Sequence, residues 1–430
     1  MLDLPPVPTP IPLNVLIVGA GPAGLATAIS VTLAGHNATI FESSDQPHPF
    51  GSGFQCSPNG TRLLLRWGLE EILKPVASSH KLLQIYDIRG KLILQKRNHE
   101  GEFSQRDGSP LWTFHRVDFQ AGLLQRATEL GVRVHYSARI TDLETSKPEI
   151  RLTNGQTHRG DLVVVADGTW STLRSKVLGR VIRPEPTGDL AYRITISRGQ
   201  IQDETVRNSM QLPQIRTWIA PGAHVVGYSM RKGTQYSLLL LLPHASSKET
   251  GNMAAIAEEM RKRAEGWDPT LTAMLKSVQK VNKWCLVQGA NTVPELTTLV
   301  SPQATCVLAG DSGHSMRPFL GQGLSLGLED AGTLGSLLAH VENPSQLPKA
   351  LSLYERLRMS RAKSIRQETG RLATCSQFEN AEPYAAATTE IASSQEYGNM
   401  YKRAHTKAQE WIWSYDAYEE AERAYLKHSY

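Results

Sequence analysis

A glycine-rich turn near the N-terminus is the first stretch whose residue types suggest binding chemistry. The apolar run at residues 15–18 (VLIV) predicts a buried strand, and it is followed by Gly19, Gly21 and Gly24. At this spacing, G-x-G-x-x-G, the first glycine permits a tight turn and the second lets the backbone approach a pyrophosphate. The third lets the following helix pack closely on the strand. The stretch therefore predicts a helix N-terminus that binds the phosphates of a dinucleotide.

An acidic residue ends the next apolar run. Residues 38–41 (ATIF) predict a second strand of the same sheet, and Glu42 follows directly. A carboxylate at this position accepts hydrogen bonds from both hydroxyls of a ribose and repels a 2′-phosphate. Because strand, glycine turn, helix, second strand and acid occur in register, they favour a dinucleotide site over an ordinary glycine turn.

Two later apolar runs also lead into acids. Residues 162–166 (LVVVA) precede Asp167, and residues 305–309 (TCVLA) are followed by Gly310 and Asp311. Ligands of open parallel sheets bind at the carboxyl ends of the strands, so we expect both acids near Glu42.

A second glycine-rich turn begins at Gly310. Residues 321–324 open a long helix packed through small residues, and its first N–H groups are available to an anionic or electron-rich group. His314 lies within the turn and has the chemistry of a base. A turn histidine that bonds to the backbone is the favoured interpretation.

The composition describes a globular protein without the marks of a nucleic-acid partner. Of 430 residues, 40% are hydrophobic, which suits two or three globular units, and the formal net charge of +5 is small. No basic stripe interleaved with aromatics occurs, so we expect no nucleic-acid binding. Arg358, Arg361, Lys363 and Arg366 recur at helical spacing and are interpreted as a solvated helix face.

Cysteine spacing and apolar-run length bear on the cellular setting. The four cysteines lie far apart without a C-x-x-C pair, so we predict neither a metal site nor a disulfide framework. Residues 1–13 are proline-rich and contain no Lys or Arg, which predicts a flexible lead-in and no signal peptide. The run at residues 238–242 is only strand-sized. We expect a soluble, cytoplasmic protein without a membrane span.

The order of predicted elements indicates an α/β fold with a second sheet. Residues 82–94 suggest two strands that meet at Arg89-Gly90, and residues 190–242 alternate as antiparallel strands. Residues 253–278 have a helical pattern, and residues 284–288 suggest a final edge strand. Asp118 is predicted to cap a helix that follows Arg116.

Three stretches in a fixed order carry a family resemblance. They are GAGPAG with Glu42, then DLVVVADG at residues 161–168, then GDSGHSMRPFLGQG at residues 310–323. This order resembles the single-component (group A) FAD-dependent aromatic monooxygenases, the salicylate and para-hydroxybenzoate hydroxylase class. Within that class it is most similar to fungal FAD monooxygenases of secondary metabolism. The resemblance extends over residues 14 to about 345 and, more weakly, over the helical tail.

The resemblance implies FAD as the bound cofactor and NADPH or NADH as a transient electron donor. It places the FAD pyrophosphate on the first glycine turn, the ribose on Glu42 and the ribityl chain beside Asp311. Arg116 could instead be a surface salt-bridge arginine, and Asp167 could merely cap the turn after its strand. The expected cofactor-binding residues are Gly19, Gly21, Gly24, Glu42, Gly53, Arg116, Asp167, Asp311, Gly321, Gly323 and Leu324.

The same resemblance points to two catalytic residues on the second sheet. Arg193 would stabilise a phenolate or donate to the flavin hydroperoxide, and Tyr228 would orient a substrate hydroxyl or an indole N–H. Pro318 would border the flavin ring. The alternatives are that Arg193 is a paired strand charge and Tyr228 a half-buried strand aromatic.

The implied reaction inserts one oxygen atom from O2 into an electron-rich aromatic through a C4a-hydroperoxyflavin. Phenol hydroxylation and indole 2,3-epoxidation both suit it, in a monomer or a homodimer. Two alternatives are a flavin-dependent reductase or dehydrogenase that inserts no oxygen, and a non-catalytic flavin-fold scaffold that binds a partner or lipid. Labelled dioxygen distinguishes a reductase or dehydrogenase from a monooxygenase, because only the monooxygenase puts label into the product. A protein that stays colourless after FAD is added would be the non-catalytic scaffold.

The resemblance also divides the chain. We expect a Rossmann-like FAD-binding domain, a substrate domain built on a mixed or antiparallel sheet, and a helical C-terminal region. The lead-in comprises residues 1–13, the FAD-binding domain 14–74, 116–186 and 291–345, the substrate domain 75–115 and 187–290, and the C-terminal region 346–430.

Overall fold

The computed structural model of the protein has a mixed α/β architecture. It describes residues 11–47, 51–97, 105–220, 222–243, 253–279, 281–288, 297–376 and 410–428. For residues 371–376 it describes the backbone alone. Most of the predicted lead-in therefore lies outside the described residues, as do residues 377–409 of the helical tail. Leu13, at the end of the lead-in, is buried in the core.

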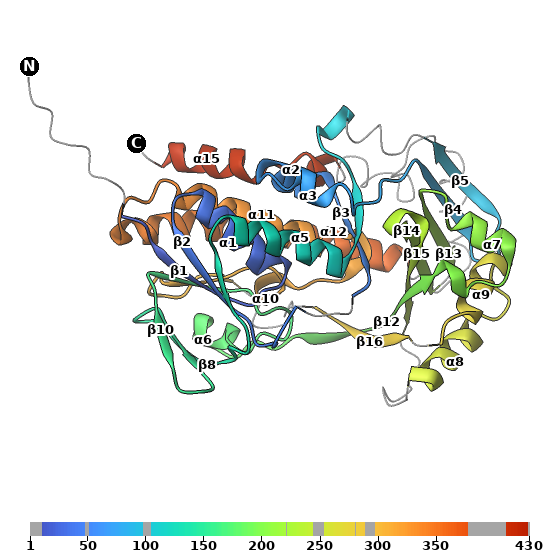
Figure 1. Cartoon of the computed structure of the whole chain (residues 1–430), viewed down its shortest axis with the longest axis horizontal. Helices are drawn as coiled ribbons and strands as arrows, with labels where there is room; N and C mark the ends of the chain where they lie inside the picture. The colour runs from blue at the N-terminus through green and yellow to red at the C-terminus, as the bar shows by residue number, and fades with distance from the viewer. Residues whose placement is uncertain are drawn as a thin grey trace, which may run out of the picture.

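A five-stranded parallel sheet forms the centre of one half of the molecule (Figure 1). Its order is β17-β11-β1-β2-β7, and the strand at residues 162–165 lies beside the first strand. Strands β1 and β11 consist of apolar runs because both faces of the sheet are covered. The strands are β1 (Asn14–Val18), β2 (Asn37–Phe41), β7 (Arg133–His135), β11 (Leu162–Val165) and β17 (Cys306–Leu308).

Helices cover one face of this sheet and a small sheet covers the other (Figure 1). The helices include α1 (Pro22–Leu33), α5 (Arg116–Glu129) and α11 (Gly323–Leu338). The antiparallel small sheet comprises β8 (Ile140–Glu144), β9 (Glu149–Leu152) and β10 (Thr157–Arg159). Helix α5 begins at Arg116 after His115, so the prediction that Asp118 is the N-cap was wrong. Asp118 lies in the first turn and forms an ion pair with Arg231 at 2.6 Å.

A seven-stranded sheet forms the other half, and its face turned away from the first sheet is covered by α7 (Glu204–Ser209), α8 (Met253–Arg263) and α9 (Pro269–Lys276). Its order is β16-β12-β15-β14-β13-β4-β5, antiparallel except between β13 and β4. The predicted hairpin at Arg89-Gly90 and the edge strand at residues 284–288 are both present. The strands are β4 (Leu82–Asp87), β5 (Leu92–Arg97), β12 (Glu185–Ser197), β13 (Gln214–Ala220), β14 (Ala223–Met230), β15 (Gln235–Pro243) and β16 (Asn282–Gln288).

The helical pattern at residues 253–278 forms two helices instead of one. Gly266 has a positive φ of 75°, and the Asp268 side chain accepts a hydrogen bond from Thr270 N to cap α9. Pro269 follows at the first helical position, where its missing N–H costs nothing. This local chemistry ends α8 and starts α9.

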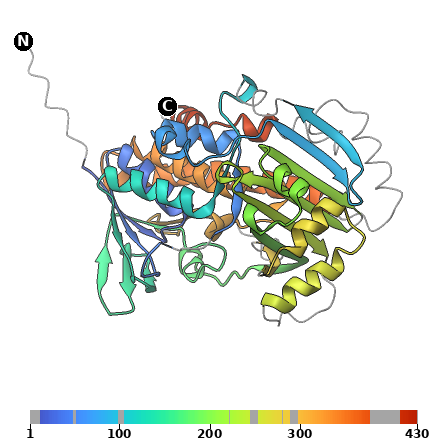
Figure 2. The same cartoon turned by 45° about the vertical axis from the view of Figure 1, so that its right-hand side comes forward.

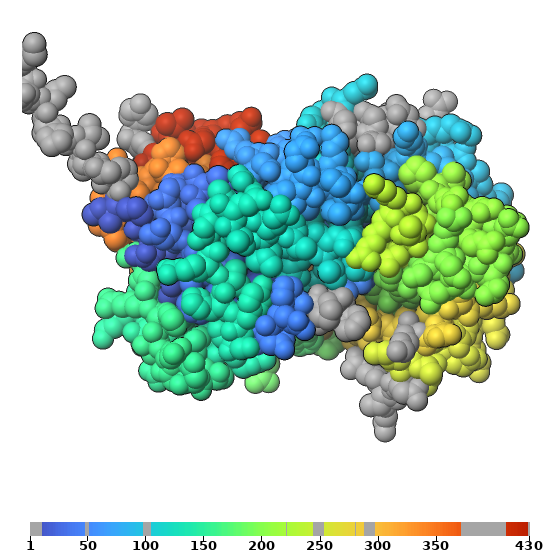
Figure 3. Space-filling view, viewed as in Figure 1, coloured from blue at the N-terminus to red at the C-terminus, as the bar shows by residue number. Residues whose placement is uncertain are grey.

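A ribbon of β3 (Gly53–Cys56) and β6 (Trp112–His115) connects the two halves, and α2 (Pro58–Arg66) and α3 (Glu70–Leu73) follow β3. Helix α12 (Leu347–Ser376) runs from the first half toward the seven-stranded sheet in both views (Figure 2). The last helix, α15 (Ala417–Lys427), lies at the surface against α11 and α12 (Figure 3).

The remaining elements are short. They are α6 (Arg174–Leu178), α10 (Asp311–His314) and the 3₁₀ turns Arg198–Gln200, Arg231–Gly233, Pro318–Leu320 and Pro344–Gln346. Within the described ranges, no helix combines the length and the apolar character that crossing a bilayer requires.

Candidate active site

The first glycine turn is as tight as its spacing predicts. Gly19 has a φ of 100°, and a Cβ there would lie 2.7 Å from the backbone oxygen of Ala166. A Cβ on Gly24 would lie 2.0 Å from the backbone oxygen of Gly19, so only glycine lets α1 pack this closely. At Gly21, by contrast, a Cβ would meet no atom of the described structure within 4 Å. The N-terminus of α1 is therefore open to a ligand at Gly21.

The Glu42 carboxylate is held at the end of β2. It accepts hydrogen bonds from Ala20 N and Ser44 N, both at 2.8 Å. Partial burial raises the pKa of Glu42, but these hydrogen bonds outweigh it and the net pKa is lowered. Glu42 is thus held as an anion beside the glycine turn, in the state that accepts hydrogen bonds from hydroxyl groups.

Asp167, at the end of β11, has one satisfied and one unsatisfied oxygen. Its Oδ2 accepts a hydrogen bond from Thr172 N at 3.1 Å, which is the capping role considered as an alternative. Its Oδ1 is buried, and the described residues supply no hydrogen-bond partner for it. Burial raises the pKa of Asp167, with partial compensation from its hydrogen bonds. An orphaned buried oxygen is costly, and a ligand donor would remove that cost.

A buried arginine that the sequence reasoning missed joins the second and third motifs. Arg174 Nε donates to Ser312 O at 2.5 Å, and its Nη2 donates to Thr169 O at 2.8 Å. Only 3% of Arg174 is exposed, and nothing in its local sequence distinguishes it from a surface arginine. Because its donors are used on backbone carbonyls, it fixes the loops that carry Asp167 and Asp311 relative to each other.

Asp330 of α11 bonds to two residues of the third motif, the stretch at residues 310–323. Its Oδ2 accepts a hydrogen bond from Gly310 N at 2.7 Å and lies 2.6 Å from His314 Nε2. The interpretation of His314 as a turn histidine bonded to the backbone was therefore wrong. Its partner is a carboxylate sixteen positions along the chain, which local sequence does not show.

Two adjoining cavities lie at the carboxyl edge of the parallel sheet. The smaller has a volume of about 540 Å³ and is lined by Gly19, Gly21 and Glu42; the larger has a volume of about 760 Å³. Both volumes fall in the range of small-molecule sites. The two cavities share as lining residues Phe54, Arg116, Asp167, Gly168, Trp170, Arg193, Asp311, Gly323 and Leu324.

The cavities bring together all but one of the expected cofactor-binding and catalytic residues. Gly53, Tyr228 and Gly321 line the larger cavity, and Pro318 lies there as well. Gly24 is the exception, since it packs behind the turn instead of lining either cavity. Arg116 is exposed at the start of α5, and among the described residues no carboxylate forms an ion pair with it.

Polar side chains of the seven-stranded sheet line the larger cavity, and three of them form its polar wall: Arg193, His224 and Tyr228. Arg193 of β12 has its guanidinium 5.2 Å from the Trp284 ring, and the described residues include no carboxylate paired with it. Burial raises the pKa of Tyr228 to about 12, so its hydroxyl keeps its proton. Gly53 is needed opposite, because a Cβ there would lie 2.7 Å from the Tyr228 ring.

His224 also lines this wall, although the sequence reasoning missed it. It lies on β14 four residues before Tyr228, and strand alternation turns both side chains to the same face. Burial lowers the pKa of His224 to about 4, so its imidazole is neutral at ordinary pH. Its Nδ1 is buried and has no hydrogen-bond partner in the described structure. The two-residue periodicity from Tyr228 was the signal that could have found it.

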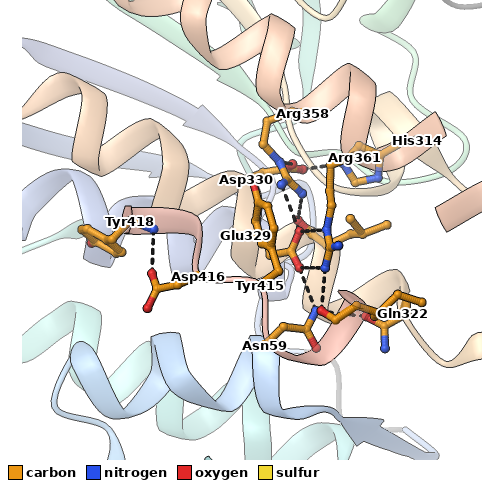
Figure 4. Close-up of polar contacts among 12 residues, drawn as sticks. Asn59, His314, Gln322, Glu329, Asp330, Arg358, Arg361, Tyr415, Asp416 and Tyr418 are labelled. Atoms are coloured by element: carbon orange, nitrogen blue, oxygen red, sulfur yellow. Dashed lines mark hydrogen bonds and ion pairs between the residues drawn. The ribbon is translucent and has the colours of Figure 1, made fainter. Parts of the chain in front are cut away.

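The basic cluster on α12 is buried, and its interpretation as a solvated helix face was wrong. Arg358 and Arg361 are 0% and 3% exposed, and they pair with Glu329 and Asp330 of α11 (Figure 4). Only Lys363 of the four is exposed. The arginines lie on the face of α12 that packs against α11, where their acidic partners are. Helical periodicity shows only that charged residues share one face. It does not show whether that face is paired or solvated.

The same network reaches the second glycine turn. Asn59 of α2 donates from Nδ2 to Glu329 Oε1 at 2.7 Å and to Gln322 Oε1 at 3.0 Å. Gln322 precedes the first residue of α11, whose N-terminus lines both cavities. The buried charges thus fix the position of this helix end (Figure 4).

The site fits a dinucleotide that carries an extended ring. The space at Gly21 is open and could hold phosphates, Glu42 is an anionic acceptor that could bind ribose hydroxyls, and the buried Asp167 Oδ1 has no hydrogen-bond donor among the described residues. The larger cavity continues from these groups to the polar wall of the second sheet. Among the described residues, no group of His, Cys, Asp or Glu has an arrangement that could hold a metal ion.

This fold and site define an FAD-binding flavoprotein, and comparison with known proteins agrees. The family described as FAD binding domain matches residues 12–369, and the chain belongs to it. The FAD-dependent monooxygenase OpS4 of Beauveria bassiana (strain ARSEF 2860) is 32% identical over 419 residues, covering 96% of this chain and 97% of the relative. The 3-hydroxybenzoate 6-hydroxylase of Polaromonas naphthalenivorans (strain CJ2) is 27% identical, with coverage of 84% and 88%.

A solved structure shares the fold. The crystal structure of CtdE in complex with FAD and a substrate superposes with a TM-score of 0.81 at 21% identity, covering 96% of this chain and 98% of that one. The protein is therefore an FAD-dependent monooxygenase of the single-component aromatic hydroxylase class.

Proposed function

We propose that this enzyme hydroxylates a phenol with O2 and a nicotinamide donor. One molecule each of NADPH or NADH, O2 and phenol, with one proton, gives the oxidised nicotinamide, water and the hydroxylated ring. The observation that carries the proposal is the position of Arg193, which lines both cavities at their junction. We further propose a secondary-metabolite substrate, on the resemblance of the three ordered motifs to fungal monooxygenases.

FAD would be held by the residues that the two cavities bring together. The first glycine turn and the N-terminus of α1 suit its pyrophosphate, and Glu42 suits its adenosine ribose. Arg116, Asp167 and Asp311 lie along the shared part of the two cavities, where the ribityl chain and ring would pass. When bound and reduced, FAD supplies the activation of dioxygen.

The polar wall suits a phenol. The Arg193 guanidinium stabilises the negative charge that develops on the phenol oxygen. Tyr228 keeps its proton and donates to the same oxygen. Together these groups raise the electron density at the ring carbons ortho and para to the hydroxyl, which are the positions that accept an oxygen atom.

The positive charge of Arg193 favours a phenol over an indole as the substrate bound at the polar wall. An indole N–H develops no anion for Arg193 to stabilise. Indole epoxidation would leave Arg193 only its other expected role, donation to the flavin hydroperoxide. The name of the bacterial relative, 3-hydroxybenzoate 6-hydroxylase, also describes hydroxylation of a phenol and supports this choice.

The opposite wall excludes water from the reacting atoms. Pro318, Phe319 and Leu320 form a turn that lines the larger cavity, and the Phe319 ring lies 6.2 Å from the His224 ring. Water exclusion strengthens the electrostatic effect of Arg193 and limits wasteful consumption of the nicotinamide donor.

Isotopically labelled dioxygen tests the proposal. Purified protein with FAD, NADPH and a panel of phenols and indoles should yield a phenol product that carries one labelled oxygen, with oxidation of NADPH. A product without label would instead establish a reductase or dehydrogenase. Protein that stays colourless with added FAD would support a binding scaffold, and labelled product from indoles alone would assign the enzyme to indole epoxidation.

A further inference from the structure

A short C-terminal segment forms part of the wall of the larger cavity. Ile412 and Trp413 line it, although they lie more than a hundred residues beyond the sheet that supplies the polar wall. They are only 1% and 8% exposed. The turn at residues 410–415 is therefore built into the cavity instead of lying loosely over it.

One buried arginine holds this turn by its backbone. Arg361 donates from Nη2 to Ile412 O at 2.7 Å and from Nη1 to Trp411 O at 3.3 Å. The Glu329 carboxylate fixes the guanidinium through two hydrogen bonds, at 2.9 and 3.1 Å. The Tyr415 ring stacks 4.0 Å from the same guanidinium (Figure 4).

A second arginine also bonds to the backbone of this turn. Arg62 of α2 donates from Nη1 to Tyr415 O at 2.8 Å, and its Nε lies 3.8 Å from Asp416. The carbonyl groups of the turn are thus satisfied by charged donors from α2 and α12. Such bonds are stronger than those between neutral groups, so the turn has a defined position.

The side chains of the turn face the region where a substrate would lie. Ile412 and Trp413 pack in one apolar cluster with Tyr228 and Ile215 of the second sheet. Tyr228 is the residue proposed to donate to the substrate hydroxyl. The apolar side chains therefore lie where they would contact the part of an aromatic substrate that carries no charge.

We propose that Ile412 and Trp413 form a specificity wall that sets the size of the aromatic substrate, and that Arg361 is the positioning residue that holds it. This proposal rests on the function proposed above. The ligand it recognises is the apolar portion of a phenol, meaning a ring or alkyl substituent remote from the hydroxyl. Smaller side chains in the wall would open space for larger substituents.

The test compares Ile412→Ala and Trp413→Leu with the wild-type enzyme on a series of alkylphenols and naphthols. FAD content, kcat, KM and product formed per NADPH consumed are measured for each phenol. We expect unchanged FAD content and a rise of about 10-fold or more in kcat/KM for bulky phenols relative to small ones, since pocket contacts of one to a few methylene groups discriminate by that order. The control Leu426→Ala, at an exposed residue of α15, should keep the wild-type profile.

Arg361 is tested by Arg361→Met and Arg361→Lys, with unfolding curves run alongside. A positioning role predicts that the folded fraction of Arg361→Met shows the same shift toward bulky phenols and that Arg361→Lys partly restores the wild-type profile. If the wall variants change kcat/KM by one common factor for all phenols, or not at all, the specificity wall is refuted. If the wild-type enzyme neither binds nor oxygenates any phenol, the proposed function itself fails.

Discussion

The Nε atom of Arg358 lies 2.6 Å from Oδ1 of Asp330, and both side chains are completely buried. The other oxygen of that carboxylate accepts the backbone N–H of Gly310, the residue before Asp311. A charge pair between two helices therefore holds the loop of Gly310 and Asp311, which lines the smaller cavity. Removing one member of such a pair leaves a buried charge without compensation.

Arg358→Met should lower the free energy of unfolding by about 3–5 kcal/mol, because Asp330 and Glu329 would lose a buried counter-charge. Arg356→Met, at the exposed position two residues earlier on the same helix, should change it by no more than about 0.5 kcal/mol. Urea unfolding followed by circular dichroism measures both. Equal effects of the two variants would show that the α12 arginines behave as a solvated face after all.

Glu42→Gln should weaken FAD binding while leaving the fold intact. The glutamine keeps one oxygen for Ala20 N but loses the charge that strengthens hydrogen bonds to ribose hydroxyls, a loss of about 1.5–3 kcal/mol. This corresponds to an increase in Kd for FAD of about 10-fold to 150-fold, measured by titrating the apoprotein and following flavin fluorescence. The exposed control Glu71→Gln should bind FAD as the wild-type protein does. An unchanged Kd for Glu42→Gln would remove Glu42 from the cofactor site.

Arg193→Met should retain the yellow colour of bound FAD but lose oxygenation. Without the guanidinium, the charge that develops on the substrate oxygen loses its cation, and removal of one such donor costs on the order of 100-fold in kcat. NADPH oxidation should continue without matching product. The matched control is Arg89→Met, at an exposed residue in the turn between β4 and β5. This variant should hydroxylate the substrate as the wild-type enzyme does. Normal coupling in Arg193→Met would show that this residue has no part in the reaction.

His80 predicts a pH dependence of stability. Burial lowers the pKa of His80 to about 3 in the folded protein, whereas in an unfolded chain the value is about 6.5. Between these values the unfolded state binds the proton and the folded state does not, so the free energy of unfolding falls as the pH drops below about 6.5. From about pH 7 to about pH 5 the loss attributable to His80 is on the order of 2 kcal/mol.

His80→Gln should remove this component of the pH dependence. Urea unfolding of the wild-type protein and the variant at both pH values gives the difference directly. If the variant loses as much stability as the wild-type protein between about pH 7 and about pH 5, His80 does not remain neutral in the folded state.

The sequence by itself determined the parallel sheet and its glycine turn. The run at residues 15–18, the spacing of Gly19, Gly21 and Gly24, and the acid at Glu42 follow from local backbone requirements, which neighbouring residues express. The buried strand beside β1 was also predictable, because a continuous apolar run needs cover on both faces. The hairpin at Arg89-Gly90 follows from turn chemistry in the same way.

Only the tertiary structure decided which polar groups meet. His314 bonds to Asp330, Arg361 to Glu329 and Arg231 to Asp118. The members of each pair lie too far apart in the sequence for a local pattern to predict the contact. Burial of a charge depends on a partner brought by the fold, so the α12 arginines looked solvated in sequence and are buried in the molecule. The placement of Ile412 and Trp413 in the cavity wall has the same cause, because side chains far apart in the chain become neighbours only when the helices pack.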